Sequence, residues 1–274
     1  MMKLEKLKKK QSIESCTKNL MRIKQKSPWM PEFARSHAKY MARELHIGSL
    51  FPLFTGNICL PDNKSYWYLC NIQDDTEGAE IYQLTKKVRG YKNECVFAQP
   101  EQCYGVDRNK LIIRQNKKLH PKSNWIANEW LSAIRSSDSF DPALVYLDTT
   151  SFAKSFVTTN LLTNTLSGCK IGTLVIANVM MNNPRSGKGD NFFDQNSLVD
   201  NLLGDEHPKN FIGWNISPEN PEENVFYSYE YQHTQTLMRS YIFFKGVLPD
   251  EESIKGEFSK VENFSLCSTN FCLT

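Results

Sequence analysis

Two strand-like runs of this chain end in an aspartate, and each is followed by a helix-like segment. Residues 103–107 read Cys-Tyr-Gly-Val-Asp and precede a helical pattern over 108–119. Residues 144–148 read Leu-Val-Tyr-Leu-Asp and precede a second one over 152–166. Strands that alternate with helices form parallel sheets, which bind ligands at the carboxyl ends of their strands. The sequence therefore predicts a ligand site where these aspartates lie.

The alternation of strands and helices stops near the C-terminal end of the chain. The most strand-like run covers 172–179, and two further runs cover 225–232 and 238–247. Only five residues join the last two runs, whereas parallel neighbours need a dozen or more. We therefore predict an antiparallel hairpin there. The fold class is α/β: a Rossmann-like three-layer α/β/α sandwich with a mostly parallel sheet, this hairpin and an N-terminal helical extension.

Composition and charge limit the class of protein. Hydrophobic residues make up 40% and charged residues 23% of the 274 residues, which is typical of a soluble globular protein. No run approaches the ~18 apolar residues of a membrane span, and no apolar core follows the N-terminal lysines. We expect an intracellular, cytoplasmic protein without membrane contact. The eight cysteines form no CxxC pair, so we expect free thiols and no metal site.

The N-terminal part of the chain is strongly basic. Residues 1–45 hold twelve Lys and Arg against four Asp and Glu, so the remainder carries a net charge of about −5. The segment is either a solvated amphipathic helix or an arm that contacts nucleic acid. We divide the chain into an N-terminal extension (1–56), an α/β domain (57–250) and a C-terminal tail (251–274).

Further strand-like runs cover 66–70 and 124–127. The resulting order of five β-α units and a closing hairpin resembles the class I S-adenosylmethionine-dependent methyltransferases. The resemblance covers residues 57–248, and Tyr229–Lys245 is similar to that family's final hairpin. It implies a seven-stranded sheet in which the last strand inserts antiparallel between its neighbours. It also implies S-adenosylmethionine as the cofactor.

The resemblance assigns the methionine end of the cofactor to the loop after the first strand. Here that loop contains Asn71, Gln73 and Gly78, and Glu80 follows at the start of a helix. The family's loop is rich in glycine, which lets the backbone approach a ligand closely. This loop has a single glycine. Glu80 is either a partner of the cofactor's amino-acid group or an acid favoured by the helix dipole.

The next two strand ends are assigned to the nucleoside part of the cofactor. Asp107 matches the family's ribose-binding acid, because a carboxylate can accept from both ribose hydroxyls. The alternative is that Asp107 only caps the following helix. Asn128 would contact the adenine, with Trp130 or Trp125 stacked on the ring, and the alternative for each tryptophan is a place in the core.

The remaining candidates concern the methyl acceptor. Asp148 and Phe152 resemble the family's active-site motif, in which polar groups orient a target amine for in-line attack. The alternative is an ordinary helix start with Asp148 as cap. Asn182, Arg185 and Lys188 lie in a loop after the fifth strand and would bind an anionic substrate, unless they are plain surface residues.

The resemblance thus implies S-adenosylmethionine-dependent methyl transfer, with the base amine of a nucleic acid, DNA or RNA, as acceptor. The alternative is a catalytically inactive methyltransferase-like protein that binds nucleic acid or serves as a scaffold. A nucleotide-binding or hydrolytic enzyme on the same sheet is a third reading. A protein partner or a homodimer is left open.

Overall fold

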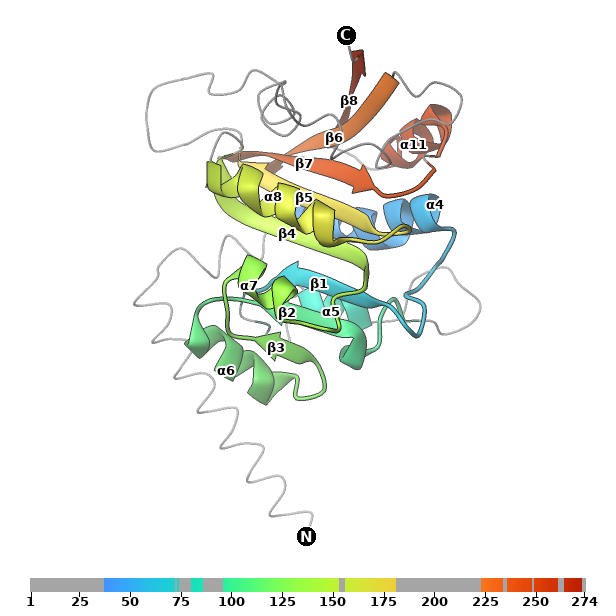
Figure 1. Ribbon diagram of the computed structural model, residues 1–274. Helices are drawn as coiled ribbons and strands as arrows, with labels where there is room; N and C mark the ends of the chain where they lie inside the picture. The colour runs from blue at the N-terminus through green and yellow to red at the C-terminus, as the bar shows by residue number, and fades with distance from the viewer. Residues whose placement is uncertain are drawn as a thin grey trace.

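A single eight-stranded sheet forms the centre of the protein, with the strand order β3-β2-β1-β4-β5-β7-β6-β8 (Figure 1). The computed structural model describes residues 37–71, 73, 80–85, 96–152, 156–180, 223–233, 236–247, 249–260 and 264–272. The strands are β1 (Ser65–Leu69), β2 (Cys103–Val106), β3 (Asn124–Ile126), β4 (Pro142–Phe152), β5 (Leu174–Met180), β6 (Glu223–His233), β7 (Thr236–Phe244) and β8 (Phe264–Cys272). The helices are α3 (His37–Leu45), π-helix η1 (His46–Leu50), α4 (Phe51–Thr55), α5 (Glu80–Thr85), 3₁₀-helix η2 (Pro100–Gln102), α6 (Lys110–Leu119), α7 (Trp130–Arg135), α8 (Phe156–Gly168) and α11 (Glu251–Phe258).

The pairing of the strands follows the predicted alternation. Strands β3, β2, β1, β4 and β5 pair in parallel, as strands linked by helices must. Strand β7 pairs antiparallel with both β5 and β6, and so lies between them. The predicted hairpin and the expected insertion of its second strand are both confirmed.

The sheet is one strand wider than expected. Strand β8 pairs antiparallel with β6 at the edge of the sheet. Residues 251–274, assigned from the sequence to a tail, therefore contain α11 and an edge strand. The run Phe-Ser-Leu-Cys-Ser-Thr-Asn-Phe-Cys lacks the continuous apolar character of a buried strand. An edge strand needs only one paired neighbour, so its sequence signal is weaker.

Strand β4 is longer than expected. It runs to Phe152, with an irregularity between Asp148 and Phe152 where it pairs with β5. The helix predicted over 152–166 is α8, which begins later, at Phe156. The alternative that Asp148 caps a helix start is therefore wrong. Thr and Phe favour extended structure, which here prevails over the capping tendency of Thr and Ser.

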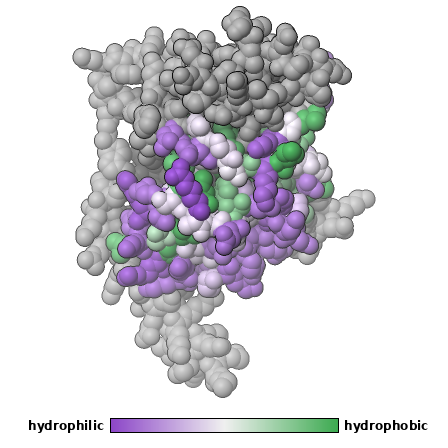
Figure 2. All heavy atoms as spheres, in the orientation of Figure 1, coloured by the Kyte–Doolittle hydropathy of each residue, from purple (hydrophilic) through white to green (hydrophobic). Residues whose placement is uncertain are grey.

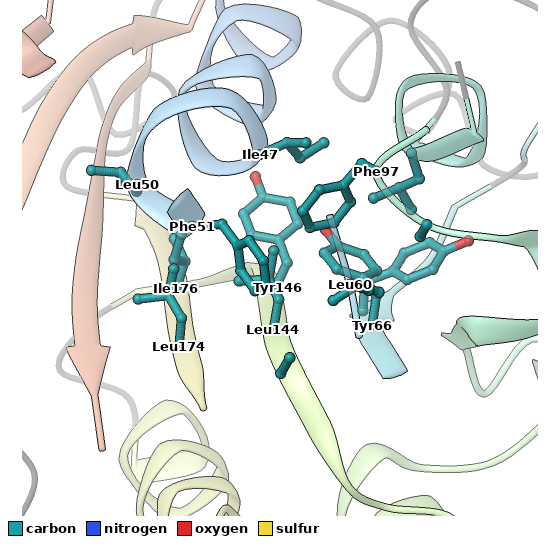
Figure 3. Close-up of a cluster of buried hydrophobic side chains, with 14 of the residues drawn as sticks. Ile47, Leu50, Phe51, Leu60, Tyr66, Phe97, Leu144, Tyr146, Leu174 and Ile176 are labelled. Carbon is teal, nitrogen blue, oxygen red and sulfur yellow. The ribbon is translucent and has the colours of Figure 1, made fainter. Parts of the chain in front are cut away.

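Two layers of helices cover the sheet and enclose two hydrophobic cores, which confirms the three-layer sandwich. Alternate side chains of each strand point to opposite faces. Tyr66, Leu144 and Ile176 face the core beneath α4 and η1, where Phe51 packs edge-on against Phe97 at 5.0 Å (Figure 3). Trp67, Leu147 and Ala177 face the core beneath α7 and α8.

The helices α3, η1 and α4 belong to the sandwich, although the sequence assigned them to an N-terminal extension. Ala42, Leu45, Leu50 and Phe51 are buried in the core that also holds Tyr66. Gly56, with φ of 70°, ends α4 in the left-handed conformation that favours glycine. The division at residue 56 thus places part of the core in the extension. Residues 1–36 lie outside the described part of the chain. Among the helices of the described part, none is long and apolar enough to cross a membrane.

Candidate functional site

The parallel strands end together at one edge of the sheet. The register aligns the last residues of β1, β2 and β3, which are Leu69, Val106 and Ile126. Positions 71, 107 and 128 follow these residues, and Asp148 of β4 lies level with them because Tyr146 pairs with Tyr68. The expectation that these strand ends share one edge is therefore confirmed.

A network of buried amides fixes the turn after β1. The Gln73 amide nitrogen donates to Glu80 Oε2 at 2.5 Å, and its oxygen accepts the backbone N–H of Ile81 at 2.9 Å. Asn116 of α6 accepts the backbone N–H of Gln73 at 2.8 Å and donates to the Asn71 carbonyl at 2.9 Å. Gln73 is fully buried. Gln73 and Glu80, both predicted to contact a cofactor, therefore bind other parts of the protein.

Glu80 also contacts a buried arginine from the N-terminal helices. Arg43 Nη1 lies 3.8 Å from Glu80 Oε1, and both side chains are almost fully buried. Burial lowers the pKa of Arg43, but Glu80, Tyr146 and Asp148 raise it and prevail. An ion pair removed from water in this way joins α3 to α5.

His46 lies in the same buried cluster. Its ring packs against the Tyr146 ring, with centroids 5.0 Å apart. Burial and the nearby Arg43 lower its pKa to about 3, although Asp148 opposes the shift. His46 is therefore neutral at pH 7. Sequence reasoning missed Arg43 and His46, because nothing in the segment 37–55 marks it as a layer on the sheet.

Asp148 is the first of three polar side chains in one row across neighbouring strands. Asp148, Asn178 and Ser240 are aligned by the registers of β4, β5 and β7. Ser240 Oγ donates to Asn178 Oδ1 at 3.1 Å, and Asn178 Nδ2 donates to Asp148 Oδ1 at 2.8 Å. Asn178 and Ser240 are completely buried, whereas Asp148 is half-buried. These two hydrogen bonds fix the orientation of the Asn178 amide and hold one carboxylate oxygen of Asp148.

Asp107 directly follows β2, and within the described residues one of its two carboxylate oxygens has no hydrogen bond. Its Oδ1 accepts the backbone N–H of Asn109 at 2.6 Å, and no other hydrogen bond reaches it in the described part of the chain. Burial raises the pKa of Asp107 more than Asn109 and Arg108 lower it. The cap of α6 is Asn109, whose Oδ1 accepts from Leu111 at 3.0 Å. Capping thus does not account for Asp107.

The predicted adenine contacts divide into one exposed residue and one core residue. Asn128 is exposed and accepts the backbone N–H of Glu129 at 2.9 Å. Trp130 is only 3% exposed, lies edge-on to Trp67 and donates to Thr165. Its ring has no free face for a nucleobase, so the stacking prediction is wrong for Trp130. Trp125 is similarly buried.

The other predicted residues give less information. Phe152 pairs with Met180 in the sheet. Gly78, Asn182, Arg185 and Lys188 lie outside the described residues. No group of three or more His, Cys, Asp or Glu side chains in the described part could hold a metal ion.

Comparisons with known proteins find similar structures only. No protein-family model matches the chain, and no curated protein sequence matches it. A putative O-methyltransferase from Klebsiella pneumoniae is 14% identical, with a TM-score of 0.45, over 86% of this chain and 90% of that one. The plantazolicin methyltransferase BpumL, solved with SAH, is 11% identical, with a TM-score of 0.44, over 84% and 90%. The type IIG restriction endonuclease BpuSI is 10% identical, with a TM-score of 0.44, over 84% of this chain but 30% of its own.

The strand order identifies the fold independently of these similarities. Strands β1 to β5 form the parallel part, and an antiparallel β7 inserts between β5 and β6. This is the arrangement that the resemblance implied, with β8 added at the edge. The chain therefore has a Rossmann-like α/β fold with the strand arrangement that this resemblance predicted.

Proposed function

We propose that this protein transfers a methyl group from S-adenosylmethionine to an acceptor. The observation that carries the proposal is Asp107, a half-buried carboxylate at the end of β2 in a sheet with the antiparallel β7 insertion. In parallel sheets, ligands bind beyond the carboxyl ends of the strands. S-adenosylmethionine, when bound, would supply a methyl group activated by its sulfonium.

Asp107 fits the ribose end of that cofactor. One of its oxygens is held by the Asn109 backbone, which orients the carboxylate, and the other accepts no hydrogen bond from the described residues. Removal of water from this carboxylate raises its pKa, and hydrogen bonds from ribose hydroxyls would offset that cost. Asn128, an exposed side chain that follows β3 at the same edge of the sheet, stays our candidate for the adenine contact.

Asp148 is the residue that would orient the acceptor. Its carboxylate is anchored on one side by Asn178 and lies near Arg43 and His46. A carboxylate fixed in this way accepts a hydrogen bond from an amine and turns the nitrogen lone pair toward the methyl group. Orientation is the main requirement of in-line transfer.

A nucleic-acid base amine is our proposal for the acceptor. It is supported by the similarity of the segment Asp148–Phe152 to the amine-orienting motif. It is also supported by the excess of basic residues in 1–45. The residues Asn182, Arg185 and Lys188 stay candidates for contacts with the substrate.

A second candidate function is a scaffold that has lost cofactor binding. It is favoured by the engagement of Gln73 and Glu80 in internal contacts, which leaves these two side chains without a role toward a ligand. Binding of the cofactor distinguishes the two functions directly.

Isothermal titration calorimetry with S-adenosylmethionine and its demethylated product provides that test. Asp107→Asn keeps the Asn109 contact but removes the charge, and a charge-assisted hydrogen bond is worth about 1.5–3 kcal/mol. We therefore expect affinity to fall roughly 10- to 150-fold in Asp107→Asn. The exposed Asp138→Asn serves as the matched control and should bind as the wild type does. An absence of binding in the wild type would refute methyl transfer and favour the scaffold.

Transfer itself is tested with radiolabelled S-adenosylmethionine and DNA or RNA oligonucleotides. Asp148→Asn should keep cofactor affinity and lose labelling of the acceptor. Wild-type turnover in this variant would remove Asp148 from the mechanism. Labelling of neither nucleic acid by the wild type would reject the proposed acceptor while leaving cofactor binding intact.

A further inference from the structure

The helix α6 concentrates positive charge on the body of the protein. Residues 108–122 contain six Lys and Arg and no Asp or Glu. The whole chain carries only +3, so the other residues together carry −3. Residues 1–45 are also basic, and the rest of the chain is mildly acidic on average. This helix is an exception within that body.

The basic residues of α6 share one face. Lys110, Arg114, Lys117 and Lys118 are all exposed, whereas the residues between them on the opposite side are buried. At 100° per residue, the four cations fall within an arc of about 100° and span about 12 Å along the helix. Figure 1 places α6 at the β3 end of the sheet, and hydrophilic residues predominate over that part of the face in Figure 2.

These four cations have no acidic partner within the described residues. The flanking Arg108 and Lys122 lie 3.8 and 3.7 Å from Glu129 and Glu101, but no carboxylate lies within 4.0 Å of the four on α6. Four like charges on neighbouring turns repel one another. An external polyanion would relieve that repulsion.

We propose that the exposed face of α6 is a docking surface for the phosphate backbone of a nucleic acid. Phosphates follow one another closely along such a backbone, so a row of cations about 12 Å long can neutralise several of them. A membrane surface fits less well, because α6 buries its apolar residues in the protein core and exposes only Leu111, at 47%. An amphipathic helix that binds an anionic membrane inserts an exposed apolar face into the lipid.

The position of α6 connects this surface to the proposed site. The helix begins three residues after Asp107, and its Asn116 holds the turn after β1. A backbone seated on α6 therefore lies next to the strand ends. The inference rests on the proposed function for the class of partner, and it names the surface that holds this partner.

The experiment measures the affinity of the full chain for fluorescein-labelled DNA and RNA by fluorescence anisotropy, without cofactor, at about 50 to 200 mM salt. The test variant carries Lys110→Gln, Arg114→Gln, Lys117→Gln and Lys118→Gln. Glutamine keeps a good helix propensity. The control variant carries Arg135→Gln, Lys170→Gln, Lys255→Gln and Lys260→Gln, which removes the same charge from exposed positions elsewhere.

We expect the α6 variant to bind more weakly than the control and with a flatter salt dependence. The slope of log K against log salt is negative, and each lost phosphate contact with duplex DNA reduces its magnitude by about 0.9. The loss of two to four contacts therefore reduces its magnitude by about 2 to 3.6. Circular dichroism should show both variants folded. The wild-type slope, which needs no variant, should be steeply negative.

Three results would overturn the inference. The first is that the two variants have equal affinities and slopes, and the second is that the wild type does not bind nucleic acid. The third is that α6-dependent binding is stronger to polyglutamate or phosphatidylserine vesicles than to oligonucleotides. Titration of the α6 variant with S-adenosylmethionine separates this result from the proposed function. If the α6 variant keeps its cofactor affinity and loses nucleic-acid affinity, both the proposed function and the α6 docking surface are supported. If the protein binds nucleic acid through α6 but binds no cofactor, only the docking surface is supported.

Discussion

The buried His46 makes the stability of this protein depend on pH in a calculable way. In the unfolded chain its imidazole has an ordinary pKa of 6.5, whereas in the folded protein burial and Arg43 lower the pKa to about 3. Between these values the unfolded state binds a proton that the folded state does not. The free energy of unfolding therefore falls as pH decreases from about 6.5 toward 3.

The magnitude follows from the two pKa values. The limiting slope is about 1.4 kcal/mol per pH unit. Between pH 7 and pH 5 the unfolded histidine changes from mostly neutral to almost fully protonated, so His46 should remove about 2 kcal/mol of stability over that interval. The loss of stability caused by His46 continues below pH 5, but carboxylates also titrate there. The interval between pH 7 and pH 5 is therefore the informative one.

Urea denaturation of the wild type and of His46→Gln at pH 5, 6 and 7 provides the assay. Glutamine does not titrate, so the loss of stability between pH 7 and pH 5 should be smaller by about 2 kcal/mol in the variant. Ile47→Val, a neighbouring core substitution that costs about 0.5–1.5 kcal/mol, controls for destabilisation alone and should keep the wild-type pH dependence. The same pH dependence in His46→Gln and the wild type would refute the assignment of His46 as a neutral, buried residue.

Three further substitutions test other parts of the structure. Arg43→Met leaves Glu80 buried without its cation and should cost about 3–5 kcal/mol in urea denaturation; a cost below about 1 kcal/mol would mean that the pair is solvated. Gly105→Ala would place a Cβ 2.4 Å from the Trp125 ring, so a cost of about 1–3 kcal/mol is expected in the same assay, and an unchanged midpoint would contradict the packing. Ser240→Ala frees the amide that holds the site carboxylate and should reduce methyl transfer more than cofactor affinity, with Ser240→Thr retaining the hydroxyl and more activity; equal activity in both variants would reject the positioning role.

The central part of the fold could be predicted from the sequence because its signals are local. Apolar runs such as 103–106 and 144–147 end in acids, and their spacing requires a parallel sheet. The short connection between β6 and β7 likewise requires a hairpin. Topology then places the ends of β1 to β4 at one edge, which is why Asp107 and Asp148 could be selected before the structure was known.

The missed features depend on tertiary contacts. Nothing in the sequence near Arg43 or His46 indicates that α3 and η1 pack on the sheet beside Asp148, because that pairing joins residues about one hundred positions apart. The same holds for Ser240, which reaches Asp148 only through the order of the strands. Trp130 was a candidate for stacking because its burial against Trp67 is visible only once the helices are in place.

The basic residues of α6 can be counted in the sequence, but the net charge of the chain does not reveal them. The net charge of the chain beyond residue 45 is negative, so the local excess in 108–122 did not stand out. The helical spacing of Ile112 and Ile113 explains why the cations collect on the opposite face.

A crystal structure of this protein with S-adenosylhomocysteine tests the central claim most directly. We predict that the ligand lies at the carboxyl ends of β1, β2 and β4, with its ribose hydroxyls about 2.5–3.0 Å from the Asp107 carboxylate. A ligand bound on another face of the sheet, or one whose ribose does not contact Asp107, would contradict it.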